Sequence, residues 1–321
     1  MPFSRLLVGA RARLAPRASR RLVVAGLLSG LLPALPLPAA AQDTVTVATA
    51  RGEVSVPARP RTVVVFDLPS IDTLDALGVE IAGVPQGPIP TFLEKYAGER
   101  YAKVGTLFEP DLEAVAALIP DLIIAGGRSQ EKTETLSAIA PTIDMTVPAT
   151  DFVGGAVARV EALATIFGKE AEARTRIDAL RSSIAALKAE SATVGTGLIV
   201  LTTGNRMSAF GPGSRFGVLH SEFGIAPADT GLDTANHGEA VSFEYIAKTD
   251  PDWLFVIDRD AAIGRGSAAA MLKNELVENT RAWKADQVVY LDPANWYLSS
   301  SGLQAMQKNV DELATALARR S

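Results

Sequence analysis

The chain has 321 residues, contains no cysteine and carries a formal net charge of −5 at pH 7. Without cysteine it can form no disulfide, and it offers no thiolate as a nucleophile or metal ligand. Its acidic balance, 36 Asp and Glu against 31 Lys and Arg, argues against nucleic acid or an anionic membrane surface as a partner. The length is sufficient for two domains.

Residues 1–41 are typical of a cleaved secretory signal. A head whose only charged residues are arginines precedes an apolar segment broken by proline, and Ala39, Ala40 and Ala41 precede Gln42. An N-terminal anchor helix is the alternative. The stretch "SRRLVV" is a weak twin-arginine pattern, so the sequence leaves the export route, Sec or twin-arginine, undecided. Because a lipid anchor needs a cysteine at the cleavage site, we expect the exported protein to be free of the membrane.

Strands and helices alternate through residues 61–147. The predicted strands are "RTVVVFD" (61–67), "IAGVP" (81–85), "DLIIAGG" (121–127) and "TIDMTV" (142–147). The predicted helices are "SIDTLDALGV" (70–79), "DLEAVAALIP" (111–120) and "KTETLSAIAP" (132–141). Short strands that alternate with helices of about ten residues predict a parallel α/β sheet.

The same alternation begins again after residue 196. "GLIVLTTG" (197–204), "DWLFVID" (252–258) and "VVYLD" (288–292) are predicted strands, and "RFGVLHSEFGI" (215–225) and "FEYIAKTDP" (243–251) are predicted helices. Between the halves, Ile177, Leu180, Ile184 and Leu187 have the spacing of an amphipathic helix. We predict one long helix there, of roughly twenty residues, which either joins two lobes as a strut or packs on one of them.

One segment of the sequence is repeated, once in each half of the chain. The matching pairs, all at the same offset, are Glu113 and Glu244, Pro120 and Pro251, Asp121 and Asp252, and Arg128 and Arg259. The alternative is that helix, Pro-Asp and strand follow one another in any α/β protein. That alternative explains Pro-Asp well but explains the shared Glu and Arg less well, so we interpret the repeat as pseudo-symmetry between two similar lobes.

Three arginines are candidates for ligand binding. Arg128 and Arg259 each follow a predicted strand, and parallel sheets place ligands at the carboxyl ends of their strands. Arg215 stands in the Gly-rich stretch "SAFGPGSRFG" before a predicted helix. The alternative for each is a solvated surface charge. Arginine grips oxyanions through its planar fork, so the three predict an anionic ligand.

The two histidines and Tyr297 have different predicted roles. His220 lies on the apolar face of a predicted helix and reads as structural, whereas His237 in "ANHGEAV" is placed in a loop from which it can reach a ligand. Tyr297 follows the last predicted strand, so it is expected at the rim of the cleft, where packing on Trp296 is the simplest role.

No motif of an enzyme is complete. Pro212 replaces the first glycine of a G-x-S-x-G elbow around Ser214, and two histidines without cysteine cannot build a His-rich zinc site. Gly211, Gly213 and Gly217 form a loose dinucleotide fingerprint. They lie well beyond the preceding strand, and no acidic residue closes a following strand at the expected distance. A nucleotide-dependent oxidoreductase is therefore the alternative, and a non-enzyme is the preferred reading.

Five stretches together resemble one family. "PDLIIAGGR", "SAFGPGSRFGVLH", "NHGEAVSFEYI", "PDWLFVIDR" and "LDPANWYLSSSG" look like the ferric-siderophore-binding proteins of ABC importers. These are class III periplasmic binding proteins, and the resemblance is to the catecholate (enterobactin-type) branch. It covers essentially the whole chain after the signal. Haem or cobalamin binding on the same fold stays an alternative within the class, although neither explains three pocket arginines.

The resemblance implies a fold and a set of roles. Two α/β lobes with parallel-type sheets would be joined by a single long helix, with the ligand cleft between them. The expected parts are a signal (1–41), an N-terminal lobe (42–167), an inter-lobe helix (168–192) and a C-terminal lobe (193–321). Arg128, Arg215 and Arg259 match the family's pocket arginines, His237 and Tyr297 its iron ligands, and Glu113 and Glu244 its contacts with the transporter.

The implied function is iron uptake. A monomer in the periplasm, with no intrinsic cofactor, would bind Fe(III) as a siderophore complex and deliver it to an inner-membrane ABC permease. Three catecholates around Fe(III) carry a charge of −3, whereas two leave coordination sites that a phenolate and an imidazole can fill. The sequence does not define the siderophore, its denticity, the affinity or the cognate permease.

Overall fold

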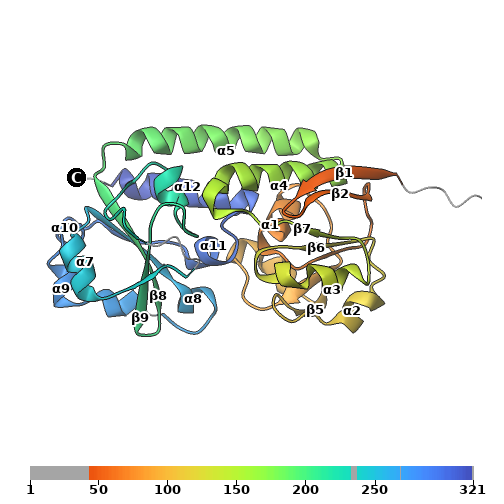
Figure 1. Cartoon of the computed structure of the whole chain (residues 1–321), viewed down its shortest axis with the longest axis horizontal. Helices are drawn as coiled ribbons and strands as arrows, with labels where there is room; N and C mark the ends of the chain where they lie inside the picture. The colour runs from red at the N-terminus through yellow and green to blue at the C-terminus, as the bar shows by residue number, and fades with distance from the viewer. Residues whose placement is uncertain (1–42, 233–236, 268, 320–321) are drawn as a thin grey trace, which may run out of the picture. The chain divides into compact units, whose positions relative to one another are not determined.

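Two β-sheets, one from each half of the chain, organise the molecule (Figure 1). The computed structural model describes residues 43–232, 237–267 and 269–319. The expected signal at 1–41 lies outside the described residues. Within the described ranges, no helix has the length and apolar character needed to cross a membrane.

The first sheet has five strands in the order β5-β4-β3-β6-β7, and all its neighbouring pairs are parallel. Its strands are β3 (Val63–Val65), β4 (Gly83–Gln86), β5 (Ala102–Thr106), β6 (Leu122–Ala125) and β7 (Thr142–Asp144). The connecting helices are α1 (Leu68–Ala76), η1 (Thr91–Ala97), α2 (Leu112–Ala117), η2 (Gly127–Lys132), α3 (Thr133–Ser137) and η3 (Ala149–Asp151). An antiparallel hairpin of β1 (Thr44–Thr49) and β2 (Gly52–Pro57) precedes the sheet. We call this half the N-terminal lobe.

The second sheet has six strands, with the path β11-β9-β8-β12-β13 and β10 beside β8. Its strands are β8 (Thr196–Thr203), β9 (Arg206–Phe210), β10 (Ala226–Pro227), β11 (Glu239–Val241), β12 (Trp253–Asp258) and β13 (Val288–Tyr290). Its helices are α6 (Val218–Ser221), α7 (Phe243–Thr249), α8 (Arg259–Ala262), η4 (Ala269–Leu272), α9 (Glu275–Glu278), α10 (Arg281–Lys284) and α11 (Pro293–Leu298). We call this half the C-terminal lobe.

The C-terminal sheet corrects one expectation, because it is mixed and not wholly parallel. Strand β9 runs antiparallel to β8 and to β11. Gly204, with φ +56, lies in the tight turn between β8 and β9 and lets the chain reverse there. The helix predicted at 215–225 is also shorter than expected, since only Val218–Ser221 is helical.

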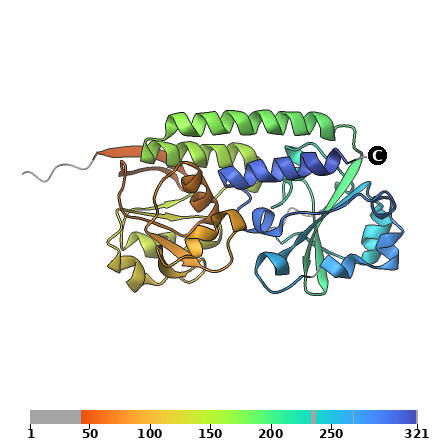
Figure 2. The same ribbon diagram turned by 180° about the vertical axis from the view of Figure 1, so that it is seen from behind.

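Three long helices connect the halves. They are α4 (Phe152–Phe167), α5 (Glu170–Ser191) and α12 (Leu303–Leu317), and they lie side by side along one flank of both sheets (Figures 1 and 2). Gly168 separates α4 from α5 with φ +66, as an αL cap. Helix α4 contributes Val160 to the core cluster of the C-terminal sheet and Ile166 to that of the N-terminal sheet. The long helix expected after Gly168 is therefore present as α5, and α4 and α12 accompany it.

The repeated Pro-Asp pair has a structural explanation. Asp121 accepts hydrogen bonds from the backbone N–H groups of Arg61 and Thr62, directly before β3. Asp252 accepts the equivalent bond from the N–H of Thr196, at the start of β8. Each aspartate thus satisfies backbone donors where the neighbouring parallel strand begins. Pro-Asp is accounted for by sheet construction, and only the Glu and Arg pairs remain as candidates for function.

Candidate functional site

The site lies where the strand order of the N-terminal sheet reverses. Strand β3 is the first strand of this sheet along the chain but lies at its centre, with β4 on one side and β6 on the other. Ligands of open α/β sheets bind outside the carboxyl ends of the strands at such a switch point. Asp67 follows β3 there, and Gly126, Gly127 and Arg128 follow β6.

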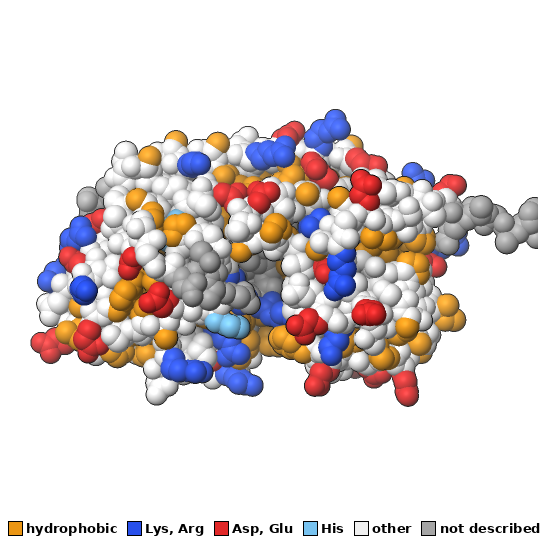
Figure 3. Space-filling view, viewed as in Figure 1, with side chains coloured by type: hydrophobic (Ala, Val, Ile, Leu, Met, Phe, Trp, Pro, Cys, Tyr) orange, Lys and Arg blue, Asp and Glu red, His pale blue; other side chains and the backbone are white. Residues whose placement is uncertain are grey.

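Three neighbouring cavities meet at this edge and share the side chain of Tyr297. Their volumes are about 610, 330 and 700 Å³, and Phe108 also lines all three. We call them together the cleft. Figure 3 shows a hollow in this face of the molecule, with Lys and Arg side chains along its edge. A hollow of this size suits a ligand larger than a simple ion.

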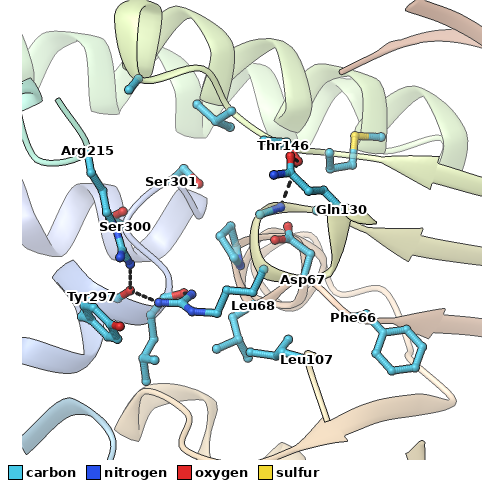
Figure 4. A pocket seen from close by; sticks show the side chains of 18 of the residues that line it. Phe66, Asp67, Leu68, Leu107, Gln130, Thr146, Arg215, Tyr297, Ser300 and Ser301 are labelled. Carbon is cyan, nitrogen blue, oxygen red and sulfur yellow. Dashed lines mark hydrogen bonds between the residues drawn. The ribbon is translucent and has the colours of Figure 1, made fainter. Parts of the chain in front are cut away.

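The three predicted arginines converge on one residue, Tyr297 of α11. Figure 4 shows the hydrogen bond from Arg215 to this residue. Arg128 Nη2 and Arg215 Nη2 both donate to the backbone carbonyl of Tyr297, at 2.6 and 2.7 Å. Arg259 Nε donates to the Tyr297 hydroxyl at 3.0 Å. Their guanidinium carbons lie 4.9, 4.4 and 5.8 Å from the centre of the tyrosine ring. The structure therefore brings together residues that lie as far as 169 positions apart in the sequence.

These positive charges are poorly neutralised within the described part of the chain. Arg259 has Asp260 at 3.7 Å, but neither Arg128 nor Arg215 has an acidic partner within ion-pair distance. Burial, and after it the charge of Arg128, lower the pKa of Arg215 to about 10. A neutral carbonyl cannot offset two guanidinium charges, so an anion that enters the cleft relieves an electrostatic cost.

The surroundings of Tyr297 lower the pKa of its hydroxyl. Burial raises the pKa of its hydroxyl, but the hydrogen bond from Arg259 and the charges of Arg215 and Arg128 outweigh this effect, and the net shift is downward. A phenolate is a hard oxygen donor of the kind that ferric iron prefers. Packing on Trp296 was the simplest expected role of Tyr297, but the tyrosine ring lies under guanidinium groups. Trp296 itself is fully buried and donates a hydrogen bond from its indole N–H to Glu312.

The other candidate residues are placed as follows. His237 is exposed and lines two of the cavities together with Arg215 and Tyr297. Among the described residues no group of three or more His, Cys, Asp or Glu could hold a metal, so a metal here would need the phenolate or donors from its own ligand. His220 is buried, with Nδ1 at 2.9 Å from the carbonyl of Ile225, which matches its predicted structural role.

Glu113 and Glu244 lie outside the cleft. Each is exposed in the first turn of its helix, α2 or α7, which Asp111 and Ser242 cap. Both helices precede the strands that end at Arg128 and Arg259. Equivalent positions in the two lobes therefore display one exposed acidic side chain each.

The geometry of a dinucleotide site is missing from the glycine loop. The loop follows antiparallel strand β9 and leads into a helix of only 4 residues, whereas the fingerprint joins a parallel strand to a long helix. Gly217 has a packing role, because a Cβ there would approach the carbonyl oxygen of Gly211 to 2.7 Å.

Sequence reasoning missed three charged residues of the cleft. Arg265 lines the cavity of about 330 Å³. Asp67 lines the cavity of about 610 Å³, and Arg206 of β9 lines that of about 700 Å³. Asp67 directly follows the first strand of a parallel sheet, a position that could have indicated it. Arg206 could not be found in this way because β9 was not predicted.

Comparison with known proteins identifies the family. The profile of the family described as "Periplasmic binding protein" matches residues 63–294. The chain belongs to the periplasmic binding protein family. It is 42% identical over 266 residues to the petrobactin-binding protein YclQ of Bacillus subtilis, covering 82% of this chain and 84% of that protein. It is 31% identical over 272 residues to the ferric-anguibactin-binding protein FatB of Vibrio anguillarum, covering 82% and 84%.

Solved structures of binding proteins share the fold. The crystal structure of YclQ superposes with a TM-score of 0.84 at 40% identity, covering 86% of this chain and 99% of that one. The periplasmic catecholate-siderophore-binding protein VctP of Vibrio cholerae gives a TM-score of 0.81 at 29% identity, covering 85% and 100%. The predicted fold class, two α/β lobes of the class III type, is confirmed. The residue boundaries drawn between the lobes stay a prediction.

Proposed function

We propose that this binding protein captures a ferric catecholate siderophore and delivers it to an inner-membrane ABC permease for iron uptake. The single observation that carries the proposal is the convergence of Arg128, Arg215 and Arg259 on Tyr297 inside the cleft. Arg128 and Arg215, which have no acidic partner among the described residues, suit a ligand of concentrated negative charge. Ferric catecholates have that charge, and the relatives YclQ, FatB and VctP are named for siderophores.

The metal contacts belong to the same proposal. Tyr297 would supply a phenolate, and His237 an imidazole, to iron that arrives with two vacant coordination sites. The lowered pKa of Tyr297 supports this role. A siderophore that already provides six donors would be held by the arginines and by the shape of the cleft alone.

The working state would be a monomer in the periplasm, released from its signal and without a lipid anchor. Glu113 and Glu244 would contact basic patches on the two halves of the permease. This role is supported by the exposure of both side chains at equivalent positions in the two lobes.

The test is a titration of the purified protein with a ferric bis-catecholate, followed by quenching of tryptophan fluorescence. Trp296 lies next to Tyr297 in α11, so occupation of the cleft should change its emission. We expect saturable binding of the iron complex and none of NADH. Tight binding of NADH with no response to the iron complex would show that the proposed function is wrong.

A further inference from the structure

The carboxylate of Asp67 has one oxygen in use and one free. Oδ2 accepts from the backbone N–H and the hydroxyl of Ser70, at 3.0 and 2.6 Å, and so caps α1. Oδ1 accepts no hydrogen bond from any described residue. It is nevertheless open to solvent, because it is absent from the described polar atoms that are fully buried without a partner. The helix cap accounts for only one of the two carboxylate oxygens of Asp67.

The free oxygen belongs to the cleft. Asp67 is 5% exposed, yet it lines the cavity of about 610 Å³ together with Gln130 and Thr146 (Figure 4). Gly126 and Gly127 leave room for it, because a Cβ at Gly126 would stand 3.0 Å from Oδ1 and one at Gly127 3.7 Å away. Two small residues thus keep a buried acid open to the ligand.

No Lys, Arg or His among the described residues forms an ion pair with Asp67. The nearest candidate, Arg128, gives its Nη atoms to the carbonyls of Tyr297 and Leu298 and forms no ion pair with Asp67. Burial raises the pKa of Asp67 to about 6, although the hydrogen bonds from Ser70 and the charge of Arg128 oppose the shift. At neutral pH the group is nevertheless mostly ionised. The cleft therefore contains a buried, half-satisfied carboxylate on the wall that belongs to the N-terminal sheet, in the same cavity as Arg128 and Arg215 but in an ion pair with neither.

We propose that Oδ1 of Asp67 accepts a hydrogen bond from a cationic amine in the backbone of the bound siderophore, so that the cleft selects a ligand with an anionic iron centre and a positively charged linker. This inference rests on the proposed function. A protonated amine would satisfy the oxygen that the protein leaves free, and a buried charge is retained at least cost when it is paired.

Two ferric complexes test this selection. One is the bis(catecholamide) of spermidine, whose linker contains a secondary ammonium, and the other is the bis(catecholamide) of octamethylenediamine. The linkers have the same number of atoms and differ by one ammonium in place of one methylene. The arginines alone would favour the octamethylene complex, which is the more anionic. We expect the wild-type protein to bind the spermidine complex about tenfold more tightly, as a charge-assisted hydrogen bond allows.

Asp67→Asn should abolish that preference and leave the affinity for the octamethylene complex within about twofold, since asparagine can still cap a helix. Asp111→Asn is the matched control. Asp111 also caps a helix, accepting from the N–H of Ala114 at 3.0 Å, but it is exposed and outside the cleft. This variant should keep the preference. Thermal unfolding of both variants shows whether the cap survives.

The other outcomes are distinct. Equal affinity of the wild type for the two complexes, or a preference that survives in Asp67→Asn, would overturn the inference and leave the proposed function intact. If Asp67→Asn weakened both complexes equally, the role of Asp67 would be to maintain the shape of the cleft. The inference would then also be overturned. If the wild type bound neither complex, the proposed function itself would be wrong.

Discussion

The side chain of Asp72 accepts a hydrogen bond from the backbone N–H of Ala305 at 2.8 Å, although 233 positions separate the two residues. Its other oxygen accepts from the N–H of Gln304 at 3.0 Å. Asp72 is fully buried in α1, and both donors belong to the first turn of α12, where backbone N–H groups have no helical partner. One carboxylate thus fixes the C-terminal helix to the first helix of the N-terminal lobe.

This contact should make stability depend on pH. Burial raises the pKa of Asp72 to about 7, although hydrogen bonds from Ala305 and Gln304 oppose the shift. An unfolded aspartate titrates near about 3.9, so the folded state binds more protons between these two values. The group's contribution is therefore fully present below about pH 4 and is lost as pH rises through about 7.

Asp72→Asn cannot titrate, so it isolates this effect. The unfolding free energy of the wild type minus that of the variant should fall between about pH 4 and about pH 7, by roughly 1.4 kcal/mol for each unit of pKa shift. Urea denaturation at a series of pH values measures it. Asp67 and Glu312, whose pKa values are also raised, are present in both proteins and cancel. A difference that does not vary with pH would contradict the assignment.

Gly302 is required beside the same carboxylate. A Cβ at this position would stand 2.2 Å from Asp72 Oδ2, although its backbone (φ −74, ψ 153) is open to any residue. Gly302→Ala should therefore lower the unfolding free energy by about 1–3 kcal/mol through overpacking. The same change in an Asp72→Gly background, which removes every Asp72 side-chain atom near this position, should cost much less. An equal cost in both backgrounds would show that the clash lies elsewhere.

The arginine cluster should be needed for affinity but not for stability. Arg128→Met, Arg215→Met and Arg259→Met should each weaken binding of a ferric tris-catecholate by ~1.5–3 kcal/mol, because each removes a charge-assisted bond. Thermal stability of the ligand-free protein should hold or rise, most clearly at Arg215, whose pKa is lowered by burial and by Arg128. Arg174→Met, at an exposed position of α5, is the control. Unchanged affinity in all three cleft variants would mean that the ligand binds elsewhere.

Tyr297 should matter only when the iron has vacant sites. A ferric tetradentate bis-catecholate bound to the wild type should show a tyrosinate-to-iron charge-transfer band, which Tyr297→Phe should remove while it keeps the ring. Affinity for a hexadentate tris-catecholate should change little. Tyr290→Phe, in β13 and outside the three cavities of the cleft, controls for the loss of a phenol. Equal losses for both complexes would assign Tyr297 to packing against the ligand.

The sequence predicted the central strands well because their residues are buried on both faces. Val63, Val64 and Val65 are each 0% exposed, and such β-branched runs are recognisable without the fold. Strands β1 and β9 were missed because their burial is uneven, with exposed or half-buried positions among buried ones. The mixed character of the second sheet depends on one of these missed strands.

The candidate site was predicted in part, for a physical reason. Arg128 and Arg259 each follow a predicted strand, so the strand pattern alone places each at the ligand-binding edge of its own sheet. Asp67 stands in the same kind of position, but its residue type also suits a helix cap, and α1 begins at the next residue. Its free oxygen depends on the clearance beside Gly126 and on where Arg128 points, which only the three-dimensional arrangement defines.

The paired acids of the two lobes give the last prediction. Glu113→Lys together with Glu244→Lys should abolish siderophore-dependent growth under iron limitation, because two basic residues would face the basic patches proposed on the permease. Affinity for the ferric siderophore should be unchanged, since both side chains are exposed and outside the cleft. Glu134→Lys together with Glu275→Lys, also exposed acids in first helical turns, should support normal growth. If the first pair weakened siderophore binding, these acids would belong to the ligand site and not to a docking surface.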